Sequence, residues 1–380
     1  MKIGIITCFD LKNLNYGNRL QAYALNYYLN KVFDGSIEAE TLYFQEFKDF
    51  KRTKKEPLFN RIQRKINRDY LHRNEKKIPD LLRNRLNNFN DFSKRNIQLV
   101  DHPLAKEELK DLEYDTYVVG SDVVWYQWNY GIRPIKLLDF QTNKKFKKIA
   151  YAASFGNDYI PRENISELRR CFSTFSNISV REKSSVEIMK SLGRSDAEYV
   201  MDPTMLLTPE EWEKIEQPMG ELKHKEFIFV YLLSSEERDR NEIKRIACNA
   251  NLPIVTIPYA SGKLNLSDAT FGDYKVIDCS PETWLWLIHN AAFVITDSFH
   301  GTVFSTKFHS NFIVTMRKEK FEMNNRMRDF LKTIRQEDKF VDLSCIDDFE
   351  GMRWDFKEID NVVNQRIDFS KEFLKRSLQG

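Results

Sequence analysis

The sequence of 380 residues has few of the features that mark secreted, membrane-spanning or metal-binding proteins. Its five cysteines are scattered and form no Cys-x-x-Cys pair, so we expect reduced, mostly buried thiols. Its six histidines form no His-x-x-x-His pair, so we expect no metal site. No apolar run approaches the ~18 residues of a membrane span. The first ten residues read as a strand and not as a signal peptide, which predicts a cytoplasmic protein.

Nucleotide-binding fingerprints are also missing. The chain contains no G-x-G, which excludes the G-x-G-x-x-G dinucleotide loop, and no G-x-x-x-x-G-K-[ST] phosphate loop. These absences give no reason to expect a bound cofactor.

Positive charge is concentrated in one segment. The net charge is only +3, yet residues 48–85 hold 14 Lys and Arg against 5 Asp and Glu. Leu58, Ile62, Ile66 and Tyr70 recur every four residues, which predicts an amphipathic basic helix. A solvated helix is one interpretation. The other is peripheral docking on the anionic inner face of a membrane or on a phosphate-bearing acceptor. No recognised nucleic-acid module is visible, so we expect no nucleic-acid partner.

Strand and helix patterns alternate along both halves of the chain, and 42% hydrophobic content is that of a globular protein. We predict an α/β protein of two Rossmann-like domains that face a cleft. The N-terminal domain covers 1–205, with a basic helical insertion at 48–95, and a linker covers 206–224. The C-terminal domain covers 225–335, and the tail 336–380 contains a helix that we expect to cross back to the first domain.

The stretch 291–305 (AAFVITDSFHGTVFS) organises the functional prediction. Its apolar part, 293–296, is typical of a buried parallel strand. Polar residues follow at the strand's carboxyl end, where α/β sheets bind ligands, and a new helix begins there with N–H groups suited to an anion. The alternative interpretation is a capped helix with a half-buried histidine. The polar residues are Asp297, Ser298, His300, Gly301 and Thr302.

Three further segments place polar groups next to strands. Ser121 and Asp122 end a predicted strand beside several aromatics, which suits either sugar binding or an ordinary core. Arg181 lies at a strand–helix junction, where it binds phosphate or carboxylate, or else pairs with a neighbouring acid. The turn Asn15-Tyr16-Gly17-Asn18 follows the first strand and reads equally as a ligand loop or a cap.

These motifs, in this order, resemble the polysaccharide pyruvyl transferase family. The resemblance is carried by 119–125 (VGSDVVW), 179–184 (SVREKS) and 296–302 (TDSFHGT), and it covers about residues 1–335. It implies a two-domain fold of the GT-B type. It also implies transfer of the enolpyruvyl group of phosphoenolpyruvate onto a sugar of a cell-surface polysaccharide (exopolysaccharide or capsule), or onto its lipid-linked precursor, to form a pyruvate ketal.

The resemblance carries individual roles onto this chain. His300 and Arg181 match the family's histidine and arginine. Where some members have Arg-Leu before the histidine, this chain has Ser298-Phe299, so a second anion-binding residue is sought among Arg317, Arg326 and Arg328. We predict His300 as general acid and Asp122 or Asp297 as base, since histidine exchanges protons near neutral pH. The predicted substrate-binding residues are Arg181, Asn15, Gly17, Asn18, Ser121, Ser298, Gly301, Thr302 and Arg326.

Two other functions stay open on the sequence. One is a GT-B glycosyltransferase that uses a nucleotide sugar, because a fold does not fix a function. The chain has no Asp-x-Asp motif, but many GT-B enzymes do without it. The other is a non-catalytic binding protein of an envelope-assembly complex, for which the change at Ser298 is the best support.

Overall fold

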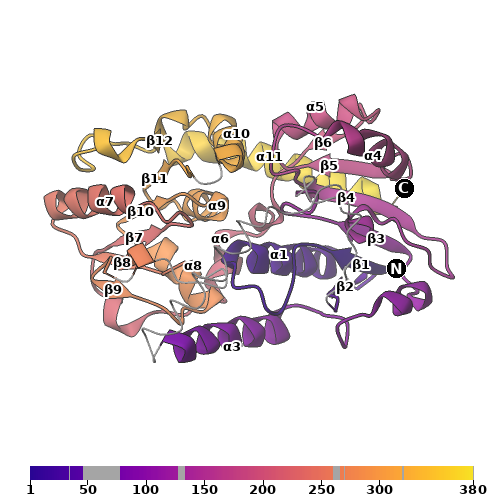
Figure 1. Ribbon diagram of the computed structural model, residues 1–380, viewed down its shortest axis with the longest axis horizontal. Helices are drawn as coiled ribbons and strands as arrows, with labels where there is room; N and C mark the ends of the chain where they lie inside the picture. The colour runs from indigo at the N-terminus through magenta and orange to yellow at the C-terminus, as the bar shows by residue number, and fades with distance from the viewer. Residues whose placement is uncertain are drawn as a thin grey trace.

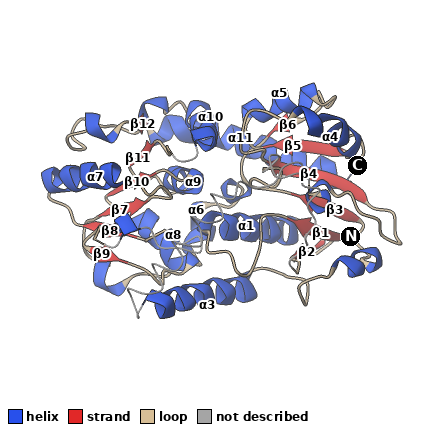
Figure 2. Cartoon of the chain, in the orientation of Figure 1, coloured by secondary structure: helices blue, strands red, loops and turns tan. Residues whose placement is uncertain are grey.

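Two parallel β-sheets, each flanked by helices, lie side by side in the computed structural model (Figures 1 and 2). The structure describes residues 1–33, 35–45, 78–126, 133–259, 266–268, 270–318 and 321–379. Most strands are short runs of buried apolar residues, as expected for parallel strands covered on both faces. The predicted α/β class with two Rossmann-like domains is confirmed.

The first sheet has the strand order β2-β1-β3-β4-β5-β6, so the connections change direction between β1 and β3. In open α/β sheets such a switch point is where ligands bind, outside the carboxyl ends of the strands. The strands are β1 (Lys2–Ile6), β2 (Glu38–Leu42), β3 (Thr116–Val119), β4 (Lys147–Ala153), β5 (Asn177–Val180) and β6 (Glu198–Tyr199).

The second sheet has the order β12-β11-β10-β7-β8-β9. Counted from β7, this is the Rossmann order, with its switch point between β7 and β10. The strands are β7 (Ile228–Tyr231), β8 (Ile254–Thr256), β9 (Tyr274–Lys275), β10 (Phe293–Thr296), β11 (Phe312–Thr315) and β12 (Phe340–Val341). Since β12 pairs with β11, the second sheet extends beyond residue 335, the boundary predicted for this domain.

Helices connect successive strands, and the last helix runs back across the molecule (Figure 1). Its Ser370 Oγ accepts a hydrogen bond from the Met201 N–H at 2.9 Å, and its Phe373 ring packs on Tyr151 of the first sheet. The predicted crossing-back helix is therefore confirmed. The helices are α1 (Tyr16–Val32), α3 (Ile78–Asn96), α4 (Ile165–Phe172), α5 (Lys183–Ser191), α6 (Pro209–Glu213), α7 (Glu237–Ala250), α8 (Pro281–Asn290), α9 (Phe299–Lys307), α10 (Asn325–Thr333) and α11 (Phe356–Gln379).

The predicted insertion is described only in its last part, helix α3, because residues 46–77 lie outside the described ranges. Helix α3 extends beneath both domains in Figure 1. Its Arg85, 1% exposed, donates hydrogen bonds to the carbonyls of Pro258, Val276 and Ile277 in the second domain. Helix α3 therefore ties the two domains together.

The start of α1 forms a second contact between the domains. The Tyr16 ring stacks on Trp284 of α8, and its hydroxyl donates to the Cys279 carbonyl at 2.9 Å. Both rings are fully buried, so burial of apolar surface contributes most of the stability here. These contacts fix the first turn of α1 against the second domain.

We expect Arg85→Ala to lower the free energy of unfolding by about 2–4 kcal/mol, because it leaves buried carbonyls without their charged donor. Arg83→Ala is the control: Arg83 is on the same helix, its side chain is 70% exposed, and it pairs with Asp80 at the surface. Urea unfolding followed by tryptophan fluorescence measures both. Equal effects of the two substitutions would show that Arg85 does not hold the domains together.

Candidate active site

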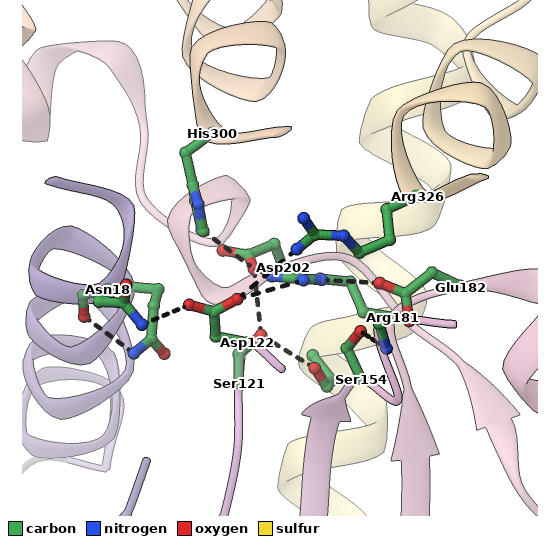
Figure 3. A network of polar contacts seen from close by, with 12 residues as sticks. Asn18, Ser121, Asp122, Ser154, Arg181, Glu182, Asp202, His300 and Arg326 are labelled. Atoms are coloured by element: carbon green, nitrogen blue, oxygen red, sulfur yellow. Dashed lines mark hydrogen bonds and ion pairs between the residues drawn. The ribbon is translucent and has the colours of Figure 1, made fainter. Parts of the chain in front are cut away.

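The Arg181 side chain is the centre of a buried polar network at the carboxyl ends of the first sheet's strands (Figure 3). It follows β5 directly and is 4% exposed. Its guanidinium contacts Asp202 Oδ2 at 2.8 Å, Glu182 Oε1 at 3.1 Å and Asp122 Oδ1 at 3.3 Å. Burial alone would lower the pKa of Arg181, but these three carboxylates raise it instead. The guanidinium thus stays charged and joins acids from three loops.

Asp122 links this network to the first helix. Its Oδ2 accepts a hydrogen bond from Asn18 Nδ2 at 2.7 Å, while its Oδ1 faces Arg181. Burial raises the pKa of Asp122, but the charges of Arg181, His300 and Arg326 outweigh it and lower that pKa. The carboxylate is thus ionised, and Asn18 of α1 and Arg181 after β5 fix its position.

Asp202 follows β6 and receives several hydrogen bonds. Its Oδ1 accepts from the N–H and the hydroxyl of Thr204, at 3.1 and 2.9 Å, and its Oδ2 lies 3.0 Å from Ser121 Oγ. Burial raises the pKa of Asp202, but His300 and Arg181 lower it well below the usual range of a carboxyl. Asp202 therefore carries a fixed negative charge in the interior.

His300 enters the network from the second domain, on the first turn of α9. Its ring is 6% exposed, and its Nε2 lies 3.6 Å from Asp202 Oδ2. This is longer than a hydrogen bond, and within the described part of the chain Nε2 has no hydrogen-bond partner. Leaving a buried ring nitrogen without a partner costs free energy of folding, which a hydrogen bond to a bound ligand would recover.

Gly17 makes room for the His300 ring. A Cβ atom at this position would lie 2.0 Å from His300 Nδ1, so only glycine lets the ring approach the backbone of α1. Glycine inside a helix costs about 1 kcal/mol relative to alanine. Glycine is needed here because the His300 ring packs directly against the first turn of α1.

Arg326 faces the same network from the start of α10 (Figure 3). Its Nη1 is 3.9 Å from Asp122 Oδ1, and its guanidinium shares the Phe299 ring with Arg181, at 5.8 and 4.1 Å from the ring centre. Burial, together with the charge of Arg181, lowers the pKa of Arg326 to about 10. Two cations (Arg181, Arg326) therefore meet three anions (Asp122, Glu182, Asp202), so the network is formally negative with neutral His300.

The other predicted residues have local roles in the structure. Asn15 caps α1 through the Asn18 N–H at 3.1 Å, and Ser298 caps α9 through the Gly301 N–H at 3.4 Å. The Thr302 hydroxyl donates back to the Ser298 carbonyl at 3.0 Å. The close packing of Gly301 on the Thr296 side chain leaves no room for a Cβ.

Asp297 lies outside the Arg181 network. Its two carboxylate oxygens accept the N–H groups of Leu233 and Ser234, at 2.6 and 2.8 Å, so it bridges the ends of β10 and β7. It also lies 3.9 Å from Arg317 Nε. The structure therefore brings together His300, Asp122, Arg181, Asn18, Ser121, Gly17 and Arg326, and places Asp297 at the switch point of the second sheet.

Several residues of the network were not predicted as site residues. Asp202, Glu182 and Phe299 are the clearest. Asp202 had a usable signal, since it follows a strand end as Asp122 does. Among the aromatics near Asp122, Trp125 is core, 1% exposed and packed on Phe155, and residues 127–132 lie outside the described ranges. No group of three or more His, Cys, Asp or Glu suited to a metal occurs in the described ranges.

We expect Gly17→Ala to reverse the usual effect of this change in a helix. Alanine normally stabilises a helix by about 1 kcal/mol, but here its methyl group would displace the His300 ring and separate the domains. The melting temperature and any activity should both fall. Gly220→Ala is the control, because a Cβ there meets open space. An unchanged or raised melting temperature for Gly17→Ala would contradict this geometry.

Comparisons with known proteins agree with the fold and identify the family. S. aureus MnaA, solved with UDP, has a TM-score of 0.52 at 9% identity, over 98% of this chain and 89% of that chain. UDP-GlcNAc 2-epimerase of Methanocaldococcus jannaschii has a TM-score of 0.51 at 12% identity, over 97% and 93%. Such low identities show a shared GT-B-like fold and nothing more. A search of curated proteins found no match. The sequence model of the family described as polysaccharide pyruvyl transferase matches residues 15–318, and the chain belongs to that family.

Proposed function

We propose that this protein transfers the enolpyruvyl group of phosphoenolpyruvate onto a sugar of a cell-surface polysaccharide, or of its lipid-linked precursor, to form a pyruvate ketal. The observation that carries the proposal is the buried network in which His300 of one domain faces Asp122, Arg181 and Asp202 of the other. Family membership supports the same reaction class. Phosphoenolpyruvate is a co-substrate here, and no cofactor takes part.

His300 is the proposed general acid. The reaction needs a proton on the methylene carbon of phosphoenolpyruvate, which becomes a methyl group as the neighbouring carbon takes on positive charge. The His300 Nε2 has no hydrogen-bond partner in the described ranges and is buried, so it is available for this transfer. The carboxylate of Asp202, 3.6 Å away, stabilises the protonated ring.

Asp122 is the proposed base for the first attacking hydroxyl of the sugar. It is ionised, and Asn18 and Arg181 fix its orientation. The sugar oxygen bonds to the central carbon, the C–O bond to phosphate breaks, and a second hydroxyl of the sugar closes the ketal. The two sugar hydroxyls release two protons. One makes up for the proton that His300 gave to the methylene carbon, and the other leaves with phosphate.

The charge of the network suits the cation that forms along this path. Three carboxylates and two guanidinium groups leave a net negative charge in a water-poor interior. A fixed field of this kind stabilises an oxocarbenium-like centre without reorganisation. Because the Arg181 guanidinium already contacts three carboxylates, we assign it to holding the acids in place. Arg326 then provides charge for the anionic donor.

The same reaction fits a protein that works at the inner face of a membrane. No helix of the described ranges is long and apolar enough to cross a membrane. We propose peripheral contact through the basic segment 48–85, most of which lies outside the described ranges. A lipid-linked acceptor would be presented at that surface.

We expect His300→Ala to abolish phosphate release from phosphoenolpyruvate in the presence of acceptor, with at least a 100-fold loss in kcat, in line with the loss of a general acid. The assay uses galactoside, mannoside and glucuronide acceptors, including lipid-linked ones. His309→Ala is the matched control, because His309 lies just beyond α9 and pairs with Asp360 near the surface. Turnover of His300→Ala near that of the control would remove His300 from the mechanism.

A further inference from the structure

Arg317 is a buried arginine at the switch point of the second sheet. It lies two residues beyond β11 and is 7% exposed. Its backbone is held from both sides by one side chain: its N–H donates to Asn324 Oδ1 at 2.8 Å, and its carbonyl accepts from Asn324 Nδ2 at 2.9 Å. The position of this residue is therefore firmly fixed.

The guanidinium of Arg317, in contrast, is not fully hydrogen-bonded within the described ranges. Its Nε is buried and has no hydrogen-bond partner within the described ranges. The nearest carboxylate, Asp297 Oδ2, is 3.9 Å away and already accepts the Ser234 N–H. Leaving the buried Nε–H without a hydrogen bond costs free energy of folding, which a ligand with acceptor oxygens would recover.

The three arginines that could bind an anion near His300 differ in their surroundings. Arg328 is exposed, and its guanidinium lies over the Phe340 ring at 4.2 Å. Arg326 contacts Asp122 and the Met323 carbonyl. Burial and the charge of Arg181 lower the pKa of Arg326, and the charge of Arg317 lowers it further. Arg317 is therefore close enough to influence the active-site network electrostatically. Of the two buried arginines, Arg317 and Arg326, Arg317 is the one with a buried guanidinium nitrogen that lacks a hydrogen-bond partner within the described ranges.

We propose that Arg317 binds a phosphate group of a substrate at the switch point between β7 and β10. This rests on the proposed function, in which the donor, phosphoenolpyruvate, is a phosphate ester. The planar guanidinium offers two parallel N–H groups to phosphate oxygens, and ligands of α/β sheets bind at this edge. The phosphate belongs either to the enolpyruvyl donor or to a sugar diphosphate.

The test measures ligand affinities of Arg317→Gln by calorimetry, with phosphoenolpyruvate, pyruvate and UDP-N-acetylglucosamine as probes. Loss of a charged hydrogen-bond pair should lower the affinity for the phosphate-bearing ligand by about 10- to 100-fold. Pyruvate has the carboxylate without the phosphate, so its affinity should stay within about twofold. Arg328→Gln, which removes an exposed arginine of the same region, should change none of the three affinities.

The two phosphate sources give different results. Selective loss of phosphoenolpyruvate binding assigns the site to the donor, and selective loss of UDP-N-acetylglucosamine binding assigns it to a sugar diphosphate. The proposal is overturned if Arg317→Gln leaves the affinities for phosphoenolpyruvate and UDP-N-acetylglucosamine unchanged. It is also overturned if the affinity for pyruvate falls as much as that for the phosphate-bearing ligand. Should Arg317→Gln not fold, Arg317→Lys keeps the charge without the fork, and an intermediate loss is expected.

A failure of the proposed function is separable from a failure of this inference. Wild-type protein that does not bind phosphoenolpyruvate contradicts the pyruvyl transfer reaction. Arg317 is then judged with UDP-N-acetylglucosamine and with inorganic phosphate, by the thermal stabilisation that each gives to wild type and to Arg317→Gln. Stabilisation of the wild type alone supports a phosphate site, and equal or absent stabilisation overturns it.

Discussion

The pairing of Arg181 with three carboxylates is the interaction on which the active site depends. Buried acids repel one another and are costly without a counter-charge, so Asp122, Glu182 and Asp202 can approach only around a guanidinium. Each acid comes from a separate loop at the carboxyl edge of the first sheet. Truncation of Arg181 would leave these charges unpaired and is therefore a poor test of its contact with substrate.

The second domain completes the site by adding His300 and Arg326. The fit depends on the first turn of α1, where Tyr16 stacks on the second domain and Gly17 admits the histidine ring. Helix α3 adds the Arg85 contact between the domains. The negative network of one domain and the His300 ring of the other are thus held close together, as the proposed proton transfer to an enol phosphate requires.

Alternating strand and helix patterns were enough to predict the two α/β domains, the returning α11 and the strand ends that hold Asp122, Arg181 and His300. They could not show that Asp297 binds the backbone after β7, because a carboxylate after a strand serves equally as cap or base. Asp202 follows a strand end as Asp122 does, but its pairing with Arg181, 21 residues earlier in the sequence, becomes visible only in the structure. The boundary at 335 was placed too early, since the two residues of β12 are too short for a periodic signal.

In the proposed reaction, the network delivers a proton from His300 to the methylene carbon of the donor. Running the reaction in D2O with phosphoenolpyruvate and an accepted sugar, and analysing the product by mass spectrometry and NMR, tests this most directly. His300 exchanges its ring protons with solvent, so we expect a ketal whose methyl group carries one deuterium. A product without deuterium in its methyl group, or a transferred sugar in place of a ketal, would contradict it.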